Sequence, residues 1–206
     1  MIPLAKSTSV LEAIPPETIP IVIIIVSIVA FTIIIERSIY YWKFKPISAD
    51  DLRRLKDLLR EGKWDEGKDF IASVNSGPAS AVVQAALDHK RRGSKYVEDE
   101  MESEGYRQIY QMEKFLTGLG TIATIGPLLG VLGTVTGMIR SFAEGAGTKG
   151  AEIGISEALI TTAMGLFVSI PSYVFYNYLV RKKEERIVEI ENISTQILQI
   201  LKSDKK

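Results

Sequence analysis

The sequence of 206 residues contains no cysteine, which excludes disulfide bonds and thiolate metal sites. Its single histidine, His89, lies in the charged run DHKRRG, and a metal site would need further ligands beside it. Neither sign of charge is in excess, because 25 Lys and Arg residues balance 25 Asp and Glu residues. A nucleic-acid-binding protein usually carries a basic surface. We therefore expect a protein without a metal, a cofactor or a nucleic-acid partner.

Three long apolar runs determine the class of protein. Each is long enough to cross a hydrocarbon core of about 30 Å as a helix that rises about 1.5 Å per residue. The first run is too long for a signal peptide and ends in the bulky sequence ERSIYYWKFK, so we predict a retained membrane helix. The third run contains a single charged residue, Glu157. The sequence therefore predicts an all-α membrane protein with three transmembrane helices.

The basic residues predict its orientation, because Lys and Arg concentrate on the cytoplasmic side of a membrane. The segment 43–114 holds 14 of them and the segment 181–206 holds 7, whereas Lys6 and Lys149 are alone in the other two polar segments. We thus place the N-terminus outside. The expected parts are a periplasmic segment (1–18), transmembrane helix 1 (19–42), a cytoplasmic helical region (43–114), transmembrane helix 2 (115–142), a periplasmic loop (143–152), transmembrane helix 3 (153–180) and a cytoplasmic C-terminal helix (181–206).

The cytoplasmic region predicts several short helices. Ser48 is followed by Asp51 and then by leucines at helical spacing, which indicates a capped helix that ends near Gly62. Further helices are expected over 64–74, 79–90 and 95–114, and the last should run directly into the second span. After the third span no breaker falls clearly before Leu201, which predicts one continuous helix of about 50 residues. One face of this extension is apolar and carries Ile187, Ile190, Ile197, Leu198 and Leu201.

Small residues mark one face of the second span. Four glycines fall within about 60° of one another on a helix and include two GxxxG spacings, which allow a second helix to approach closely in lipid. We predict that they serve helix packing. Thr134 lies beside this face. The four glycines are Gly126, Gly130, Gly133 and Gly137.

The third span has a polar stripe that begins at Glu157. A polar stripe on a membrane helix must face protein or water, because lipid cannot satisfy hydroxyl groups. An ionisable residue within the bilayer is by default a candidate functional residue. The alternative is that Glu157 lies in the interfacial zone and is simply solvated. The other members of the stripe are Thr161, Thr162, Gly165, Ser169 and Ser172.

No pattern of residues typical of a catalytic site is present. Nothing resembles a nucleophile triad, a phosphate-binding loop or a pair of carboxylates for general acid–base catalysis, so we do not predict an enzyme. If protons cross this protein, a carboxylate of another polypeptide must carry them.

Two segments resemble the MotA/TolQ/ExbB proton-channel family, most of all its ExbB/TolQ-type subunits. The sequence GPLLGVLGTVTGM at 126–138, followed by Phe142, resembles the second-span signature. The sequence GISEALITTAMGL at 154–166, followed by Ile170-Pro171 and Tyr176-Asn177, resembles the third-span signature. The two segments cover about 55 residues in the expected order, and a first span ending in Glu36-Arg37 agrees with them.

The resemblance implies a subunit of a motor driven by the proton-motive force in the bacterial inner membrane. Five copies would surround a dimer of single-span ExbD/TolR-like partners, each bringing a membrane aspartate, and a TonB/TolA-like energy-transducing protein is a further expected partner. The pore-facing positions correspond to Thr134, Glu157 and Thr162. We add Thr161 and Ser169 of the same stripe to the predicted pore lining, and Pro171 to the predicted packing residues.

Some alternatives remain open. The motifs do not distinguish an ExbB-type from a TolQ-type subunit, or coupling to H⁺ from coupling to Na⁺. A flagellar-type stator subunit is disfavoured because it has four spans. A passive oligomeric scaffold is the main alternative function, and it predicts that Thr134 and Thr162 tolerate valine.

Overall fold

The structure of the chain is a computed structural model that describes residues 15, 17–44, 46–74, 77–91, 96–145 and 147–203. All regular elements of this part of the chain are helices. Segment 1–14 and the expected helix breakers at 75–76 and 92–94 lie outside the described residues. The chain divides into two compact units: a membrane unit (residues 1–36 and 115–178) and a charged unit (residues 37–114 and 179–206).

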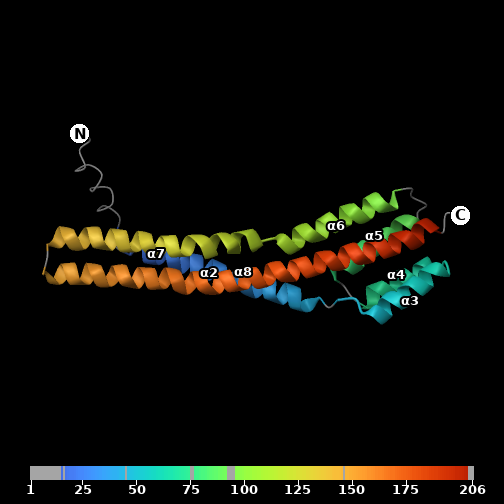
Figure 1. Ribbon diagram of the computed structural model, residues 1–206, viewed down its shortest axis with the longest axis horizontal. Coiled ribbons are helices and arrows are strands. Elements are labelled where there is room, and N and C mark those ends of the chain that lie inside the picture. The colour runs from blue at the N-terminus through green and yellow to red at the C-terminus, as the bar shows by residue number, and fades with distance from the viewer. Residues whose placement is uncertain are drawn as a thin grey trace, which may run out of the picture. The chain divides into compact units, whose positions relative to one another are not determined.

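The membrane unit combines three helices that are apolar enough to cross a membrane. It contains most of α2 (Thr18–Lys43), all of α7 (Leu116–Glu144) and the first half of α8 (Lys149–Ser203). Figure 1 shows α7 and the first half of α8 side by side. Three helices of the described chain are long and apolar enough to span a bilayer, which confirms the prediction of an all-α protein with three spans.

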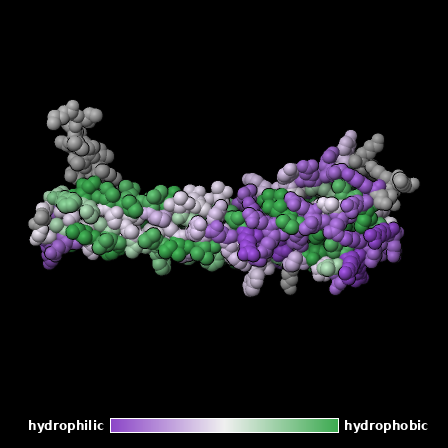
Figure 2. Space-filling model, viewed as in Figure 1, coloured by the Kyte–Doolittle hydropathy of each residue, from purple (hydrophilic) through white to green (hydrophobic). Residues whose placement is uncertain are grey.

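Large apolar side chains cover much of the surface of the membrane unit. Ile28, Leu128 and Phe167 are 62%, 62% and 72% exposed. Figure 2 shows this hydrophobic covering on the face in view. A water-soluble monomer rarely exposes a large contiguous apolar patch. Hydrocarbon would instead cover these side chains at no cost, and the chain is therefore a multi-pass membrane protein.

Glycines of α7 allow its backbone to lie against that of α8. A Cβ on Gly130 would lie 3.0 Å from the Cα of Thr162, and a Cβ on Gly137 would lie 2.8 Å from the Cβ of Ala158. In the reverse direction, a Cβ on Gly165 would lie 2.6 Å from the carbonyl oxygen of Gly126. Any side chain at these positions would therefore push the two helices apart.

The charged unit is a small bundle of α3 (Ala49–Arg60), α4 (Trp64–Val74), α5 (Pro78–Arg91), α6 (Val97–Glu113) and the second half of α8. Ser48 caps α3 as predicted, because its Oγ accepts a hydrogen bond from the amide of Asp51 at 3.1 Å. After α3, Gly62 has a φ of +75°, which glycine adopts without steric cost.

The second half of α8 supplies part of the core of this bundle. The continuous helix expected after the third span is confirmed, since α8 runs for 55 residues. Ile190, Ile197 and Leu201 are buried as the apolar face predicted, whereas Ile187 and Leu198 are only partly covered. Ile193 is also buried and belongs to the same core.

The backbone between α6 and α7 differs from the prediction of an uninterrupted helix. Helix α6 ends at Glu113, Lys114 has a ψ of 130° and Phe115 has the left-handed angles φ 67° and ψ −15°. Neither residue is a proline or a glycine, so the sequence carries no ordinary sign of a break here. The last carbonyls of α6 bind side chains of α2 instead: Arg37 donates to the oxygen of Gln111 and Tyr41 to that of Met112.

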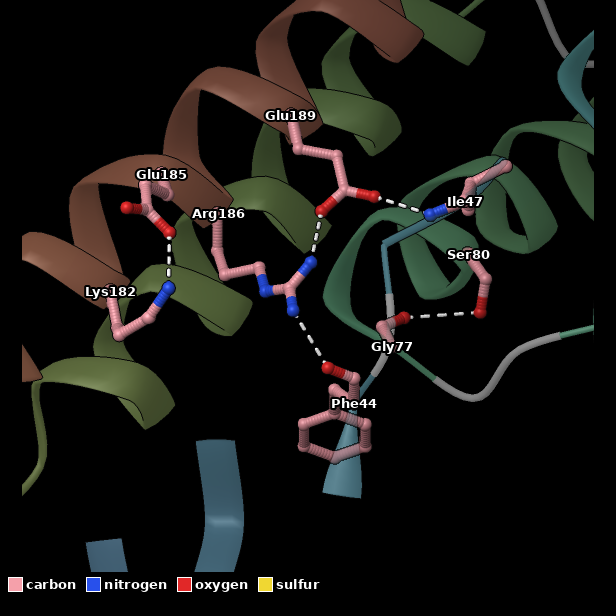
Figure 3. Close-up of polar contacts among 8 residues, drawn as sticks. All are labelled: Phe44, Ile47, Gly77, Ser80, Lys182, Glu185, Arg186 and Glu189. Atoms are coloured by element: carbon pink, nitrogen blue, oxygen red, sulfur yellow. Dashed lines mark hydrogen bonds and ion pairs between the residues drawn. The ribbon is translucent and has the colours of Figure 1, made fainter. Parts of the chain in front are cut away.

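An ion pair on α8 holds the backbone that follows α2 (Figure 3). Arg186 donates to Glu189 and to the carbonyl oxygen of Phe44, each at 2.7 Å. The other carboxylate oxygen of Glu189 accepts from the amide of Ile47 at 2.7 Å. The two charged side chains are each only 17% exposed. This pair therefore supplies hydrogen-bond partners to a segment that lies outside any helix.

Removing the Arg186 guanidinium should destabilise the charged unit. We expect Arg186→Met to cost roughly 1–3 kcal/mol, because it leaves a partly buried carboxylate and a backbone carbonyl without their donor. Thermal unfolding of the full chain in mild detergent, followed by circular dichroism, measures the effect. Lys182→Met is the matched control, because its partner Glu185 is exposed and such pairs contribute little. Equal shifts for the two variants would contradict this role of Arg186.

Adding one methyl group at the α7–α8 contact should also destabilise the protein. We expect Gly130→Ala to cost roughly 1–3 kcal/mol, because its Cβ meets the backbone of Thr162 and the helices must separate. In the same unfolding assay, Gly118→Ala should be neutral or stabilising, since a Cβ there meets nothing within 4 Å. If both substitutions change the unfolding temperature equally, the close α7–α8 approach does not explain the effect of Gly130→Ala.

Candidate functional site

Most of the polar stripe of α8 lies against α7. Thr161, Ser169 and Ser172 are 5%, 3% and 1% exposed, and Thr161 and Ser169 pack directly against glycines of α7. Each hydroxyl donates to a carbonyl three or four residues earlier in α8, at 2.7–2.8 Å. That Thr161 and Ser169 line a pore remains a prediction, and within this chain the α7–α8 contact covers most of both side chains. These short hydroxyl side chains cover the glycine face of α7.

Thr162 belongs to the same stripe but has a different environment. It is partly exposed, and its Oγ1 donates to the carbonyl oxygen of Gly130 on α7 at 3.0 Å. A hydrogen bond between membrane helices typically contributes about 0.6 kcal/mol. The bond also fixes where the hydroxyl points, because its proton is directed toward α7. The remaining lone pairs of the oxygen can accept a hydrogen bond from another group.

Thr134 of α7, like Thr162, donates its hydroxyl proton to a backbone carbonyl. Its side chain is partly exposed, and its Oγ1 donates to the carbonyl oxygen of Val131 at 2.7 Å. Threonines on helices commonly make this bond to their own backbone. Thr134 and Thr162 thus both present hydroxyl oxygens whose protons are already engaged. Such oxygens are suited to accept a hydrogen bond from a protonated carboxyl group.

Glu157 is exposed and lines a groove of the membrane unit formed by α2, α7 and α8. The groove has a volume of about 210 Å³. Arg140 of α7 and Glu17, just before α2, are its other charged residues. Thr136 adds a hydroxyl that donates to the carbonyl oxygen of Gly133 at 3.0 Å. Thr161 of α8 also lines the groove, which therefore combines two carboxylates, one guanidinium and two threonines at the edge of an apolar unit.

The packing of α7 on α8 shows how far apart Thr134, Glu157 and Thr162 lie along the helix pair. Gly133 lies against Thr161 and Gly137 lies against Ala158, so Thr134 is level with this part of α8. Glu157 and Thr162 are five residues apart, about 7.5 Å along the helix. Thr134, Glu157 and Thr162 therefore occupy one short length of the α7–α8 pair.

The remaining predicted residue, Pro171, lies within α8 and is partly buried. Helix α8 continues across it, although proline has no amide hydrogen and leaves the carbonyl one turn earlier without its usual donor. Helix α7 likewise continues across Pro127. Both prolines are thus accommodated within membrane helices.

Three polar residues of this region were not among the predicted site residues. Arg140 is the first charged residue after the apolar stretch of the second span, and Thr136 is adjacent in sequence to Gly137 of the glycine face. Ser141 is buried and donates to the carbonyl oxygen of Ala151 at 2.9 Å, which ties the end of α7 to the start of α8. The signal available in the sequence is spacing: Thr136 and Arg140 are four residues apart, one helical turn.

No metal centre is formed by the part of the chain that the structure describes, since no three His, Asp or Glu residues there are grouped to hold an ion. The hydroxyl and carboxyl groups of the site can form hydrogen bonds, and the carboxyl groups can bind protons.

Comparison with known proteins gives a consistent assignment. The model of the MotA/TolQ/ExbB proton channel family matches residues 74–192, which include α7 and the polar part of α8. Putative biopolymer transport protein ExbB-like 3 of Synechocystis sp. is 32% identical over 161 residues, or 73% of this chain and 75% of that protein. Tol-Pal system protein TolQ of Haemophilus influenzae is 31% identical over 181 residues, or 77% of this chain and 76% of that protein. Biopolymer transport protein ExbB of Aquifex aeolicus is 39% identical over 99 residues, or 44% of this chain and 67% of that protein. The chain therefore belongs to the MotA/TolQ/ExbB proton channel family, as an ExbB/TolQ-type member.

Proposed function

We propose that this protein is the pore-forming subunit of a bacterial inner-membrane motor that couples ion flow to work on the cell envelope or to outer-membrane transport. Membership in the family supports a role in energy transduction across a membrane. The observation that carries the proposal is the exposure of Glu157 and the partial exposure of Thr134 and Thr162 along one short length of the α7–α8 pair, while the rest of the polar stripe is buried in helix packing.

The chemistry of these groups suits a proton carrier supplied from outside the chain. Within residues 115–139 and 153–180, Glu157 is the one charged side chain. A membrane aspartate of an ExbD/TolR-like single-span partner would provide the carrier. In its protonated form it would donate to the oxygens of Thr134 or Thr162, whose own protons are engaged by backbone carbonyls. Glu157 would attract cations at one mouth of the path.

The energy available supports a mechanical role. Each elementary charge that crosses a potential of 100 mV releases about 2.3 kcal/mol. Five copies of this chain around a partner dimer would offer successive, equivalent hydroxyl positions to the carrier. Stepwise proton loading could then drive rearrangement of the partner, and a TonB/TolA-like protein would receive the work.

A passive scaffold is the competing function, and the burial of Thr161 and Ser169 in the α7–α8 contact favours it to that extent. The two functions differ in what they require of the exposed threonines. A scaffold needs only their shape, which valine preserves, whereas an ion path needs their oxygens.

Ion flux therefore tests the proposal directly. The protein and its single-span partner, reconstituted in liposomes with a pH-sensitive dye, are subjected to an imposed membrane potential. We expect Thr134→Val and Thr162→Val each to lower proton flux about 2- to 10-fold, because a hydrogen bond between neutral groups is worth about 0.5–1.5 kcal/mol. Glu157→Gln should also lower the flux, because it removes the negative charge at the mouth of the path.

Two controls separate an ion path from a structural effect. Thr162→Ser keeps the hydroxyl and should restore most of the flux. Thr32→Val changes an exposed threonine of α2 that also bonds its own backbone, and it should leave the flux unchanged. Wild-type flux in both Thr134→Val and Thr162→Val would favour the scaffold.

A further inference from the structure

The break between α6 and α7 has an unusual backbone. Helix α6 ends at Glu113 and α7 begins at Leu116, so the interruption is only two residues long. Phe115 adopts a left-handed conformation, with φ 67°. Helices often end with a residue in this conformation, but that residue is usually glycine, because a Cβ makes it costly. Something must therefore compensate for the left-handed phenylalanine.

The compensation comes from two side chains of α2. In an uninterrupted helix, the carbonyl of Gln111 would bond to the amide of Phe115, and that of Met112 to the amide of Leu116. In the observed structure Arg37 Nη1 donates to the oxygen of Gln111 at 2.9 Å, and Tyr41 Oη donates to that of Met112 at 3.0 Å. The two carbonyls thus have donors although the helix has ended.

The two donor side chains are buried and held in place by their surroundings. Arg37 is 4% exposed and Tyr41 is 8% exposed. They are four residues apart and so lie on one face of α2. The guanidinium of Arg37 also lies 4.6 Å from the ring centre of Tyr40, which limits its freedom. A buried carbonyl without a donor costs about as much as a lost hydrogen bond, so these two side chains have a direct effect on where α6 ends.

We propose that the α6–α7 junction has two conformations, and that Arg37 and Tyr41 are positioning residues that select the broken one. In the broken conformation α2 satisfies the carbonyls of Gln111 and Met112. In the continuous conformation the amides of Phe115 and Leu116 satisfy the same carbonyls, and Phe115 returns to helical angles. The two sets of donors therefore compete for the same two carbonyl oxygens. The device itself does not depend on the proposed ion path.

Hydrogen exchange of the Leu116 amide distinguishes a two-state junction from one that Arg37 and Tyr41 merely stabilise. Tyr41→Phe removes one hydroxyl and keeps the ring. We expect it to slow exchange at Leu116 by about 2- to 10-fold in the full chain in lipid nanodiscs, because the amide gains the Met112 carbonyl as its acceptor. If Tyr41 only stabilises its surroundings, its loss should instead speed exchange. Tyr110→Phe is the control, because that residue lies on the same part of α6 and is 74% exposed.

Substitutions at Phe115 test the same equilibrium with α2 intact. Its side chain is 47% exposed, so replacing it does not open a core cavity. Phe115→Ala should slow Leu116 exchange, since alanine favours the helix and disfavours left-handed angles. Phe115→Gly should leave exchange at or above the wild-type rate, and in the Tyr41→Phe background it should restore that rate. Unchanged or faster exchange in both Tyr41→Phe and Phe115→Ala would overturn the proposal.

Discussion

The close approach of two backbones, α7 and α8, is the constraint on which the membrane unit depends. Lipid provides no hydrophobic drive for one apolar helix to join another, so association must come from dense packing and hydrogen bonds. The glycines of α7 remove the side chains that would keep the helices apart, and short hydroxyl residues of α8 fill the space. This contact also decides which polar groups are available. It covers Thr161 and Ser169 and leaves Thr134, Glu157 and Thr162 accessible.

A second theme is the use of charged and phenolic side chains to satisfy backbone groups where helices end. Arg186 and Glu189 bind the segment after α2, and Arg37 and Tyr41 bind the last carbonyls of α6. Each of these side chains is buried or nearly so. A buried polar backbone group must find a partner, and non-helical segments have none of their own. Side chains from a distant part of the sequence therefore fix the points at which the helices stop.

The sequence predicts the helices well where their limits have a local cause. Helix α4 covers the expected 64–74, Ser48 caps α3, and α8 is continuous because no glycine or proline interrupts its second half. The break at Phe115 has no such cause, since the donors that favour it come from α2, more than seventy residues earlier. Helical periodicity likewise predicts that the polar residues of α8 share one face, but it does not predict which helix packs against that face. For that reason the buried Thr161 and Ser169 could not be separated from Thr162, and the groove that joins Arg140 to Glu157 could not be foreseen.

The central claim is that this protein forms a pore around a partner that carries the proton. Native mass spectrometry tests it most directly, on the full chain co-expressed with a single-span protein that has an aspartate within its span and purified in mild detergent. Our account predicts one complex with five copies of this chain and two of the partner. A monomer or dimer that leaves the partner unbound would contradict the account.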